Sequence, residues 1–417
     1  MKNLFIINFL LFAFCVTAQD LTRAKKNIKT LTAEKFHGRG AAFGGDSLAA
    51  NFIEKQFKAI GLKPIGDSYF QGFTYGINTF QGQLKLKSNV GVFKPGIDFI
   101  VRSSSGSGKG TYPVMRLDSS IFLDENALST FLTKDLRNVV VVYSKKHLKE
   151  FTASTVDLLR QLYSAAAIIE IQDAKLTMSL SDQSFGTPVF EMLASAFTPN
   201  IQTISFEIEN ELIEKHVARN VIAYIEGATH PDSFVVITAH YDHLGSLGKK
   251  HYFPGANDNA SGVSMLLELA HHYSINRPAC SIVFIAFAGE ESGLIGSSFF
   301  VRKPTFDLKA IRFLINLDLL GTGDDGIMVV NGSIFKDAYA TLVAINDEKK
   351  LLPAIKMRGE AANSDHYPFY KKEVPCFFIY TLGGITAYHD VKDIAKTLPL
   401  TKYKEVFELI VLFADVQ

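Results

Sequence analysis

Four short runs of almost uninterrupted apolar residues recur in the second half of this chain. The runs, all between residues 233 and 380, read SFVVITA, SIVFIAFA, RFLINL and PCFFIY. Strands that are apolar along their whole length are typical of sheets covered on both faces, and parallel strands need a crossover connection between them. The pattern therefore predicts an α/β protein with three α/β/α layers and a mostly parallel, central mixed sheet.

Amphipathic segments separate the apolar runs and supply the crossovers. Apolar residues at helical spacing predict helices at 261–273, 293–302, 336–348 and 402–414. A further helix is expected from Ser47 to Ile60, because Gly61 occupies the position of a C-terminal cap and Pro64 follows it. Alternating strands and helices of this kind support the layered α/β fold.

Residues 76–205 have a different pattern. Short alternating strands are separated by polar loops, and they read GQLKLKS, NVVVVYS, AAIIEIQ and TISFEIE. We expect a β-rich inserted domain over 76–205, carried by a larger α/β domain that is formed by residues 19–75 and 206–417.

The first 18 residues are typical of an export signal. Lys2 gives a positive start, an apolar run extends from Leu4 to Val16, and Ala18 predicts cleavage before Gln19. An N-terminal membrane anchor is the alternative, but this run is shorter than the roughly 20 residues that span a bilayer. We expect an exported protein, periplasmic or extracellular, with no membrane span after cleavage.

The net charge bears on the possible partners, and the cysteine content bears on possible disulfides. The net charge of +1 gives no reason to expect nucleic acid or an anionic membrane as a partner. Signal cleavage would leave Cys280 and Cys376, both beside strand-like apolar runs, as two buried thiols or as one disulfide.

Metal-binding side chains follow the apolar runs, at the strand ends where open α/β sheets bind ligands. They are His240 and Asp242 after the first run, Glu290 and Glu291 after the second, Asp318 after the third, His389 after the fourth, and Asp258 in the loop between the first two. Imidazole and carboxylate together suit Zn²⁺ or a similar divalent ion. One zinc ion usually takes three protein ligands, so five candidate ligands predict two ions that share a bridging carboxylate. The five are His240, Asp258, Glu291, Asp318 and His389.

Each of these residues also has a simpler explanation. A lone histidine after a strand is usually a hydrogen-bonding residue, Asp258 could cap the following helix, and Asp318 could belong to a turn. Glu290 and Glu291, however, follow a run too apolar for the surface, and burying two carboxylates without a cation is costly. The occurrence of every candidate at a strand end favours the metal centre.

Six motifs in a fixed order resemble a known family. They are AHYDH, GANDNASG, FAGEESGLIGS, NLDLLG, SDHYPF and YHDVKD, and they resemble the co-catalytic di-zinc aminopeptidases, a family that includes glutamate carboxypeptidases. The resemblance covers residues 215–417 and the early segment from His37 to Pro64. Two departures are Asp390 and Val391, where the family usually has Thr-Pro, although Asp393 is retained. The insert resembles a protease-associated domain only faintly.

The resemblance implies a role for each candidate residue, with two zinc ions per chain. Asp258 would bridge the ions, His240 and Asp318 would complete one coordination shell, and Glu291 and His389 the other. Glu290 would be the general base. Asp242 resembles a carboxylate that orients a ligand histidine, and Tyr388 resembles a hydroxyl that stabilises the oxyanion, or else is a packing aromatic. Asp365 and His366 resemble residues of a substrate pocket, or else form a turn before Pro368.

The implied function is a secreted zinc exopeptidase, an aminopeptidase that removes N-terminal residues from peptide substrates through a metal-bridging hydroxide. One alternative is a glutamate-type carboxypeptidase, for which Arg102, Lys109 and Arg358 are candidate partners of the substrate carboxylates. A second is a single-zinc glutaminyl cyclase on the same fold. A non-catalytic binding protein is disfavoured by the complete set of ligands.

Overall fold

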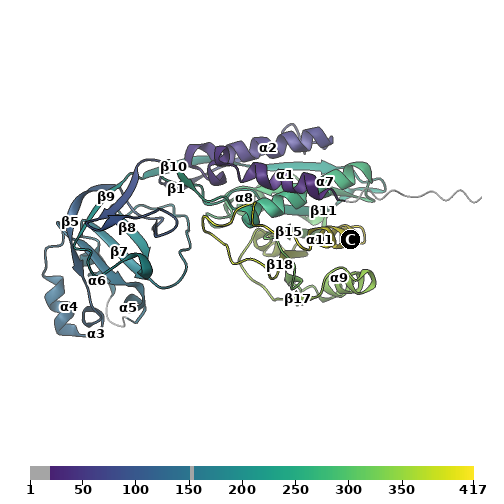
Figure 1. Cartoon of the computed structure of the whole chain (residues 1–417). Helices are drawn as coiled ribbons and strands as arrows, with labels where there is room; N and C mark the ends of the chain where they lie inside the picture. Colours follow the sequence, from purple (N-terminus) through teal and green to yellow (C-terminus); the bar gives the residue numbers. More distant parts are fainter. Residues whose placement is uncertain (1–18, 151–154) are drawn as a thin grey trace, which may run out of the picture.

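The computed structural model describes residues 19–150 and 155–417, which form two lobes (Figure 1). The larger lobe is built on one eight-stranded sheet and the insert on another. The predicted export signal lies outside the described residues. Within the described ranges, no helix is long and apolar enough to cross a bilayer.

The sheet of the larger lobe has the strand order β1-β10-β14-β11-β15-β18-β16-β17. The strands are β1 Phe70–Thr79, β10 Glu211–Ile225, β11 His230–His240, β14 Cys280–Phe287, β15 Ile311–Leu317, β16 Ile327–Val330, β17 Ile355–Met357 and β18 Cys376–Thr381. The central strands β14, β11, β15 and β18 run parallel, whereas β1, β10 and β16 make antiparallel pairs. The four apolar runs lie in these central strands, and the predicted mixed sheet is confirmed.

Helices cover both faces of this sheet. One face carries α1 Leu21–Leu31, α2 Gly45–Ile60, α7 Gly262–Ile275, α9 Lys336–Lys349 and α11 Tyr403–Ala414, and the other carries α8 Ile295–Arg302 and α10 His366–Tyr370. Val235 and Ile237 of β11 pack into the core under the first group, and Val236 packs into the core under the second. This burial on both faces explains why the strands are apolar throughout.

The predicted helices are present, with ends shifted by no more than one or two residues. Gly61 adopts the left-handed conformation, with a φ of 88°, and its N–H donates to the carbonyl of Lys58, as expected for a C-terminal cap. The sequence analysis did not predict α1, which begins where the Asp20 carboxylate accepts bonds from the N–H groups of Thr22 and Arg23.

The insert has the strand order β3-β2-β9-β5-β6-β7-β8-β4. Its strands are β2 Leu84–Ser88, β3 Gly91–Val92, β4 Phe99–Val101, β5 Gly108–Arg116, β6 Val140–Ser144, β7 Ala167–Gln172, β8 Val189–Leu193 and β9 Thr203–Ile208. Strands β5 to β8 run parallel. The crossovers are α3 Ser120–Leu123, α4 Glu125–Leu132, α5 Lys145–Glu150 and α6 Thr155–Leu162. The insert is therefore itself an α/β unit, with helices that the sequence analysis did not predict.

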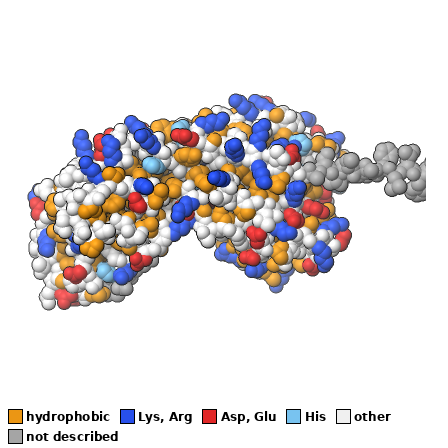
Figure 2. Space-filling view, in the orientation of Figure 1, with side chains coloured by type: hydrophobic (Ala, Val, Ile, Leu, Met, Phe, Trp, Pro, Cys, Tyr) orange, Lys and Arg blue, Asp and Glu red, His pale blue; other side chains and the backbone are white. Residues whose placement is uncertain are grey.

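The two lobes are joined by a ribbon and by a shared apolar core. Strands β1 and β10 pair along their length and lead into and out of the insert (Figure 1). Leu244, Leu247 and Phe253 come from the larger lobe but pack into the core of the insert, beside its own Leu176 and Met178. On the face drawn in Figure 2 the molecule is hollowed where the two lobes meet.

Both cysteines among the described residues are accounted for. Cys280 begins β14 and Cys376 begins β18, and the two thiols are buried and free. The interpretation of two buried thiols is confirmed.

Candidate metal centre

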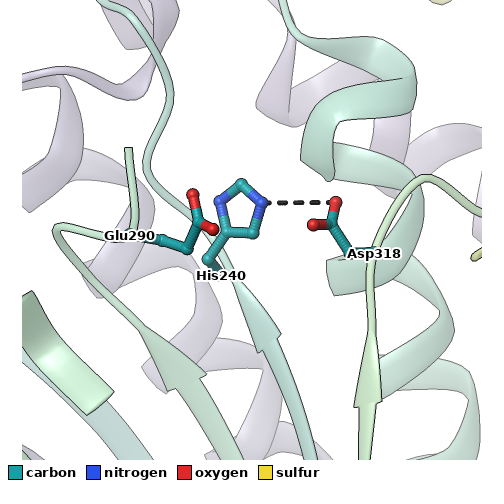
Figure 3. A group of neighbouring side chains, drawn as sticks. All are labelled: His240, Glu290 and Asp318. Atoms are coloured by element: carbon teal, nitrogen blue, oxygen red, sulfur yellow. Dashed lines mark ion pairs between the residues drawn. The ribbon is translucent and has the colours of Figure 1, made fainter. Parts of the chain in front are cut away.

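The parallel strands bring the predicted ligands to one edge of the sheet. His240 is the last residue of β11, Asp318 follows β15, and Glu290 follows β14 (Figure 3). The Nε2 atom of His240 lies 3.3 Å from Oδ1 of Asp318. One oxygen of Glu290 lies within 4.8 Å of both groups, so these three side chains form one candidate metal group.

Asp258 links this group to a second one. Its Oδ1 lies 3.4 Å from Nε2 of His240, and its Oδ2 lies 3.0 Å from Nε2 of His389. The same Nε2 of His389 is 3.0 Å from Oε2 of Glu291. The five predicted ligands therefore lie together as two groups that share one carboxylate, which is the arrangement of a bridging ligand.

The balance of charge tests whether a cation fits here. Seven carboxylates gather around the two groups, those of Asp242, Asp258, Glu290, Glu291, Asp318, Asp365 and Asp393. Burial raises the pKa of Glu290 well above its usual range and raises those of Asp242 and Asp365 to about 7. Oδ1 of Asp318 is buried without a hydrogen-bond partner. This donor set, hard oxygens with imidazoles and too little positive charge, suits divalent cations.

The two histidines carry compensating charge in the metal-free arrangement. Burial lowers the pKa of His240, but the charges of Glu290 and Asp318 outweigh it and leave the pKa well above the usual value. Burial likewise opposes protonation of His389, whose bonds to Asp258 and Glu291 raise its pKa to about 11. Metals bind neutral imidazole, so cations at these two positions would replace the protons.

The Arg39 guanidinium and the Asp393 carboxylate hold the loop that carries Asp258. Asp393 accepts bonds from the backbone N–H groups of Asn257 and Asp258. Arg39 is fully buried and donates to the carbonyls of Leu31, Tyr241, Pro254, Gly255 and Asp258. Burial lowers the pKa of Arg39 to about 10, which leaves it charged at neutral pH. The sequence analysis missed Arg39, although it lies within the early segment that resembles the family.

Asp242 fixes the positions of two neighbouring strand ends. Its carboxylate oxygens lie 3.2 Å from the backbone N–H groups of Glu290 and Glu291, which donate to them. Nδ1 of His240 lies 3.2 Å from the carbonyl oxygen of Asp242 and 3.8 Å from its carboxylate. The backbone of Asp242 is thus closer to the ring of His240 than its side chain is.

His243 is a second residue that the sequence analysis left without a role. Its Nδ1 lies 2.6 Å from Oε1 of Glu291, and the two share a candidate metal group with Asp258. Its Nε2 is buried without a partner. Its position in the AHYDH motif, three residues after His240, could have identified it from the sequence as part of the site.

Tyr388 packs against a predicted ligand. Its ring stacks on that of His389, with 3.9 Å between the ring centroids and an angle of 12° between the planes. Partial burial, followed by the charges of Asp258 and Glu291, raises the pKa of the Tyr388 hydroxyl. The stacking agrees with the interpretation as a packing aromatic, and contact with an oxyanion stays a prediction.

Asp365 and His366 lie at the start of α10, and both are fully buried. The ring of His366 packs on Phe378, and burial lowers its pKa to about 4. Both carboxylate oxygens of Asp365 lack a hydrogen-bond partner. Contact with substrate stays a prediction for these residues, and their burial does not support it.

Comparison with known proteins agrees with this geometry. Residues 220–414 match the model of peptidase family M28. These residues form a peptidase family M28 domain. The resemblance inferred from the six motifs is confirmed.

The relatives of this M28 domain are matched over part of their length. Aminopeptidase YwaD of Bacillus subtilis is 29% identical over 201 residues, which cover 47% of this chain and 43% of that protein. A probable zinc metalloprotease of Pyricularia oryzae is 40% identical over 111 residues, 26% of this chain and 22% of its own length. The chain thus spans less than half of the curated relatives that it matches.

Solved structures resemble the M28 domain and the insert together. A zinc aminopeptidase from Bacillus subtilis superposes with a TM-score of 0.69 at 21% identity, covering 95% of this chain and 94% of that one. An aminopeptidase from Aneurinibacillus sp. strain AM-1 gives a TM-score of 0.63 at 21% identity, over 96% and 94% of the two chains. At this identity the comparison shows a shared fold.

Proposed function

We propose that this protein is an exported aminopeptidase that binds two zinc ions and removes N-terminal residues from peptides. The observation that carries the proposal is the position of Asp258, with one carboxylate oxygen toward His240 and the other toward His389. Asp318 completes the first group and Glu291 the second. The names of the M28 relatives support zinc as the metal.

In the proposed hydrolysis, five residues bind the metal ions and a sixth transfers the proton. Zinc ions held by the five ligands would supply a water of lowered pKa and would polarise the scissile carbonyl. Glu290 lies beside the first group, where its carboxylate can accept a proton, and burial raises its pKa well above the usual value. We assign it to take the proton of the attacking water and to pass it to the leaving amine.

The charge of the site favours a free amino terminus over a free carboxylate. Carboxylates line both groups and suit an ammonium group. The Arg39 guanidinium is fully buried and all its donors are bonded to backbone carbonyls, so it has none left for a substrate carboxylate. Arg102, a candidate for binding a substrate carboxylate, instead pairs with Glu170 and Glu191 inside the insert. Arg358 donates to the hydroxyl of Tyr380. These contacts support the aminopeptidase over the carboxypeptidase.

The test is to count zinc per purified chain and to assay aminoacyl and N-blocked chromogenic substrates with and without a chelator. We expect about two zinc ions, with chelator-sensitive release from free-amine substrates only. One zinc ion would favour the cyclase, and cleavage only beside a C-terminal acidic residue would favour the carboxypeptidase. A protein without zinc or turnover would contradict an enzymatic function.

Export is the part of the proposal that rests on residues 1–18 alone. Expression of the full chain in a host with a secretory pathway, followed by N-terminal sequencing, tests it. The exported product should begin at Gln19, because Ala18 ends the small-residue cleavage site. Retention of Met1 in the cell would contradict export.

A further inference from the structure

The predicted ligand His389 lies on a loop and not on a strand or helix. Its backbone is in the left-handed region, with a φ of 52°, and its side chain is only 15% exposed. His240, by contrast, is held by a central strand. Tyr388 of the same loop stacks on the ring of His389, but a stacked ring can still turn in its plane. The partner of the second ring nitrogen fixes how an imidazole presents the first, so that partner decides the orientation.

The contact that orients the ring comes from the insert. Nδ1 of His389 lies 3.0 Å from the carbonyl oxygen of Met178, and the N–H of Met178 donates to the carbonyl of His389 at 3.0 Å. These two residues are 211 positions apart in the chain. The bond to Met178 leaves Nε2 free to face Asp258 and Glu291.

Lys175 attaches the same loop at three points. Its ammonium donates to the carbonyls of Thr386 at 2.9 Å and of Tyr388 at 2.8 Å, and it pairs with the Asp390 carboxylate at 2.6 Å. Three bonds satisfy all three donors of a lysine. The acceptors lie on both sides of His389, so Lys175 sets the course of the backbone that carries this histidine. Asp390 is one of the positions where the chain departs from the family pattern.

The segment that carries Lys175 is itself well anchored. Leu176 and Met178 are buried in the core that the insert shares with Leu244 and Phe253 of the larger lobe. The segment and the His389 loop together line a cleft of about 450 Å³ between the lobes. Lys175 is thus fixed relative to both lobes at the point where it binds the loop.

We propose that Lys175 is a positioning residue through which the insert completes the second metal group, the one formed by Asp258, Glu291 and His389. This inference rests on the proposed function, because it assumes that these side chains hold a metal. It assigns the insert a part in metal binding and makes an asymmetric prediction. Loss of the Lys175 contacts should weaken one zinc site and spare the site of His240 and Asp318.

The experiment follows zinc release from the full chain during titration with a chelator, in wild type and in Lys175→Met, which removes the charge but keeps the length. Substitution of a residue that holds a metal ligand in place typically costs about 10- to 100-fold in metal affinity, so we expect one of the two zinc ions to leave at about 10- to 100-fold lower chelator concentration. The other ion should leave as in wild type. Lys85→Met is the control, since Lys85 makes a similar pair with Glu207 in the insert, at 2.7 Å.

The outcomes separate this inference from the proposed function. Wild type that retains no zinc would contradict the proposed function and this inference together. Wild type with two zinc ions and an unchanged release curve for Lys175→Met would overturn the positioning role alone. Equal weakening of both ions, with a lowered melting temperature, would also overturn it, because a merely structural residue acts that way. Asp390→Asn, which weakens the same ion pair, should reproduce the selective loss to a smaller degree.

Discussion

Each lobe buries a cluster of charged side chains, and the two clusters differ in their balance. In the insert, the fully buried Glu170 accepts bonds from Arg102 and Tyr143, and Glu191 pairs with Lys145 at 2.7 Å. In the larger lobe, seven carboxylates surround the three imidazoles of His240, His243 and His389 and the guanidinium of Arg39. A balanced cluster satisfies itself and stabilises a fold, whereas an unbalanced one marks the place where an external cation belongs.

Glu290→Gln has the largest expected effect and tests whether the unbalanced cluster is a catalytic site. General acid–base catalysis contributes about 100- to 10,000-fold to a rate, so hydrolysis should fall by that factor. Glu290 lies within reach of the first group, but the proposal makes it the base and not a ligand, so the zinc content should be unchanged. A steady-state assay with zinc analysis measures both quantities, and full turnover by this variant would remove Glu290 from the mechanism.

Arg102→Met probes the balanced cluster. It leaves Glu170 buried with an unpaired charge, and breaking a buried pair in this way costs about 3–5 kcal/mol in the free energy of unfolding. Denaturant unfolding followed by circular dichroism should show this loss without any change in zinc content.

The matched control is Arg137→Met, since Arg137 pairs with Asp135 on the surface at 2.7 Å. Exposed pairs contribute about 0–1 kcal/mol. A cost for Arg102→Met no larger than that of the control would show that the cluster in the insert is not a stabilising network.

Metal removal probes the unbalanced cluster. A ligand at about 1,000 times its dissociation constant stabilises the folded state by roughly 4 kcal/mol. The chelated protein should therefore melt several degrees below the zinc-loaded one in calorimetry. Asp258→Asn, which weakens the shared ligand, should remove most of that difference. If zinc-loaded and chelated wild type melted at the same temperature, the metal would not be bound in this cluster.

The smallest expected effect is a pH dependence of the metal-free protein. Burial raises the pKa of Asp365 from 3.8 to about 7, so between these values the folded state binds more protons than the unfolded state. Its contribution to stability therefore falls as the pH rises from about 4 to 7. Asp365→Asn should flatten this slope in unfolding measurements across that range.

Asp135→Asn serves as the control for Asp365→Asn. The pKa of Asp135 is lowered to about 2 by Arg137, so it titrates below this window. An equal flattening by both variants would show that the slope does not come from Asp365.

Local pattern was enough to predict the central sheet, five of the helices that cover it and the five clustered ligands. A strand covered on both faces must be apolar throughout, and the end of such a strand is a distinctive place for a histidine or an aspartate. His240, Asp318 and Glu291 were identified in this way. His389, after the fourth run, and Asp258, in the loop between the first two runs, were candidates by position as well. The family resemblance then supplied the role of each ligand.

The missed residues act through contacts that no local pattern contains. Arg39 bonds to carbonyls more than 200 positions away, and a buried arginine has no sequence signature of its own. Lys175 looks like any polar loop residue until the fold brings it to the His389 loop. The helices of the insert were missed because their segments were interpreted as polar loops between strands, although α4 and α6 are as long as the predicted α8, with eight residues each.

The shared core of the two lobes has a consequence for biosynthesis. The strands of the insert end at Ile208, yet three of the apolar side chains that complete its core, Leu244, Leu247 and Phe253, come later in the chain. Domains generally fold in order of synthesis as they leave the ribosome. The insert therefore leaves the ribosome with part of its apolar core exposed. That part is covered only when the segment after His240 has been synthesised. Closure of this core and the approach of His389 to Met178 are then late steps of one folding event.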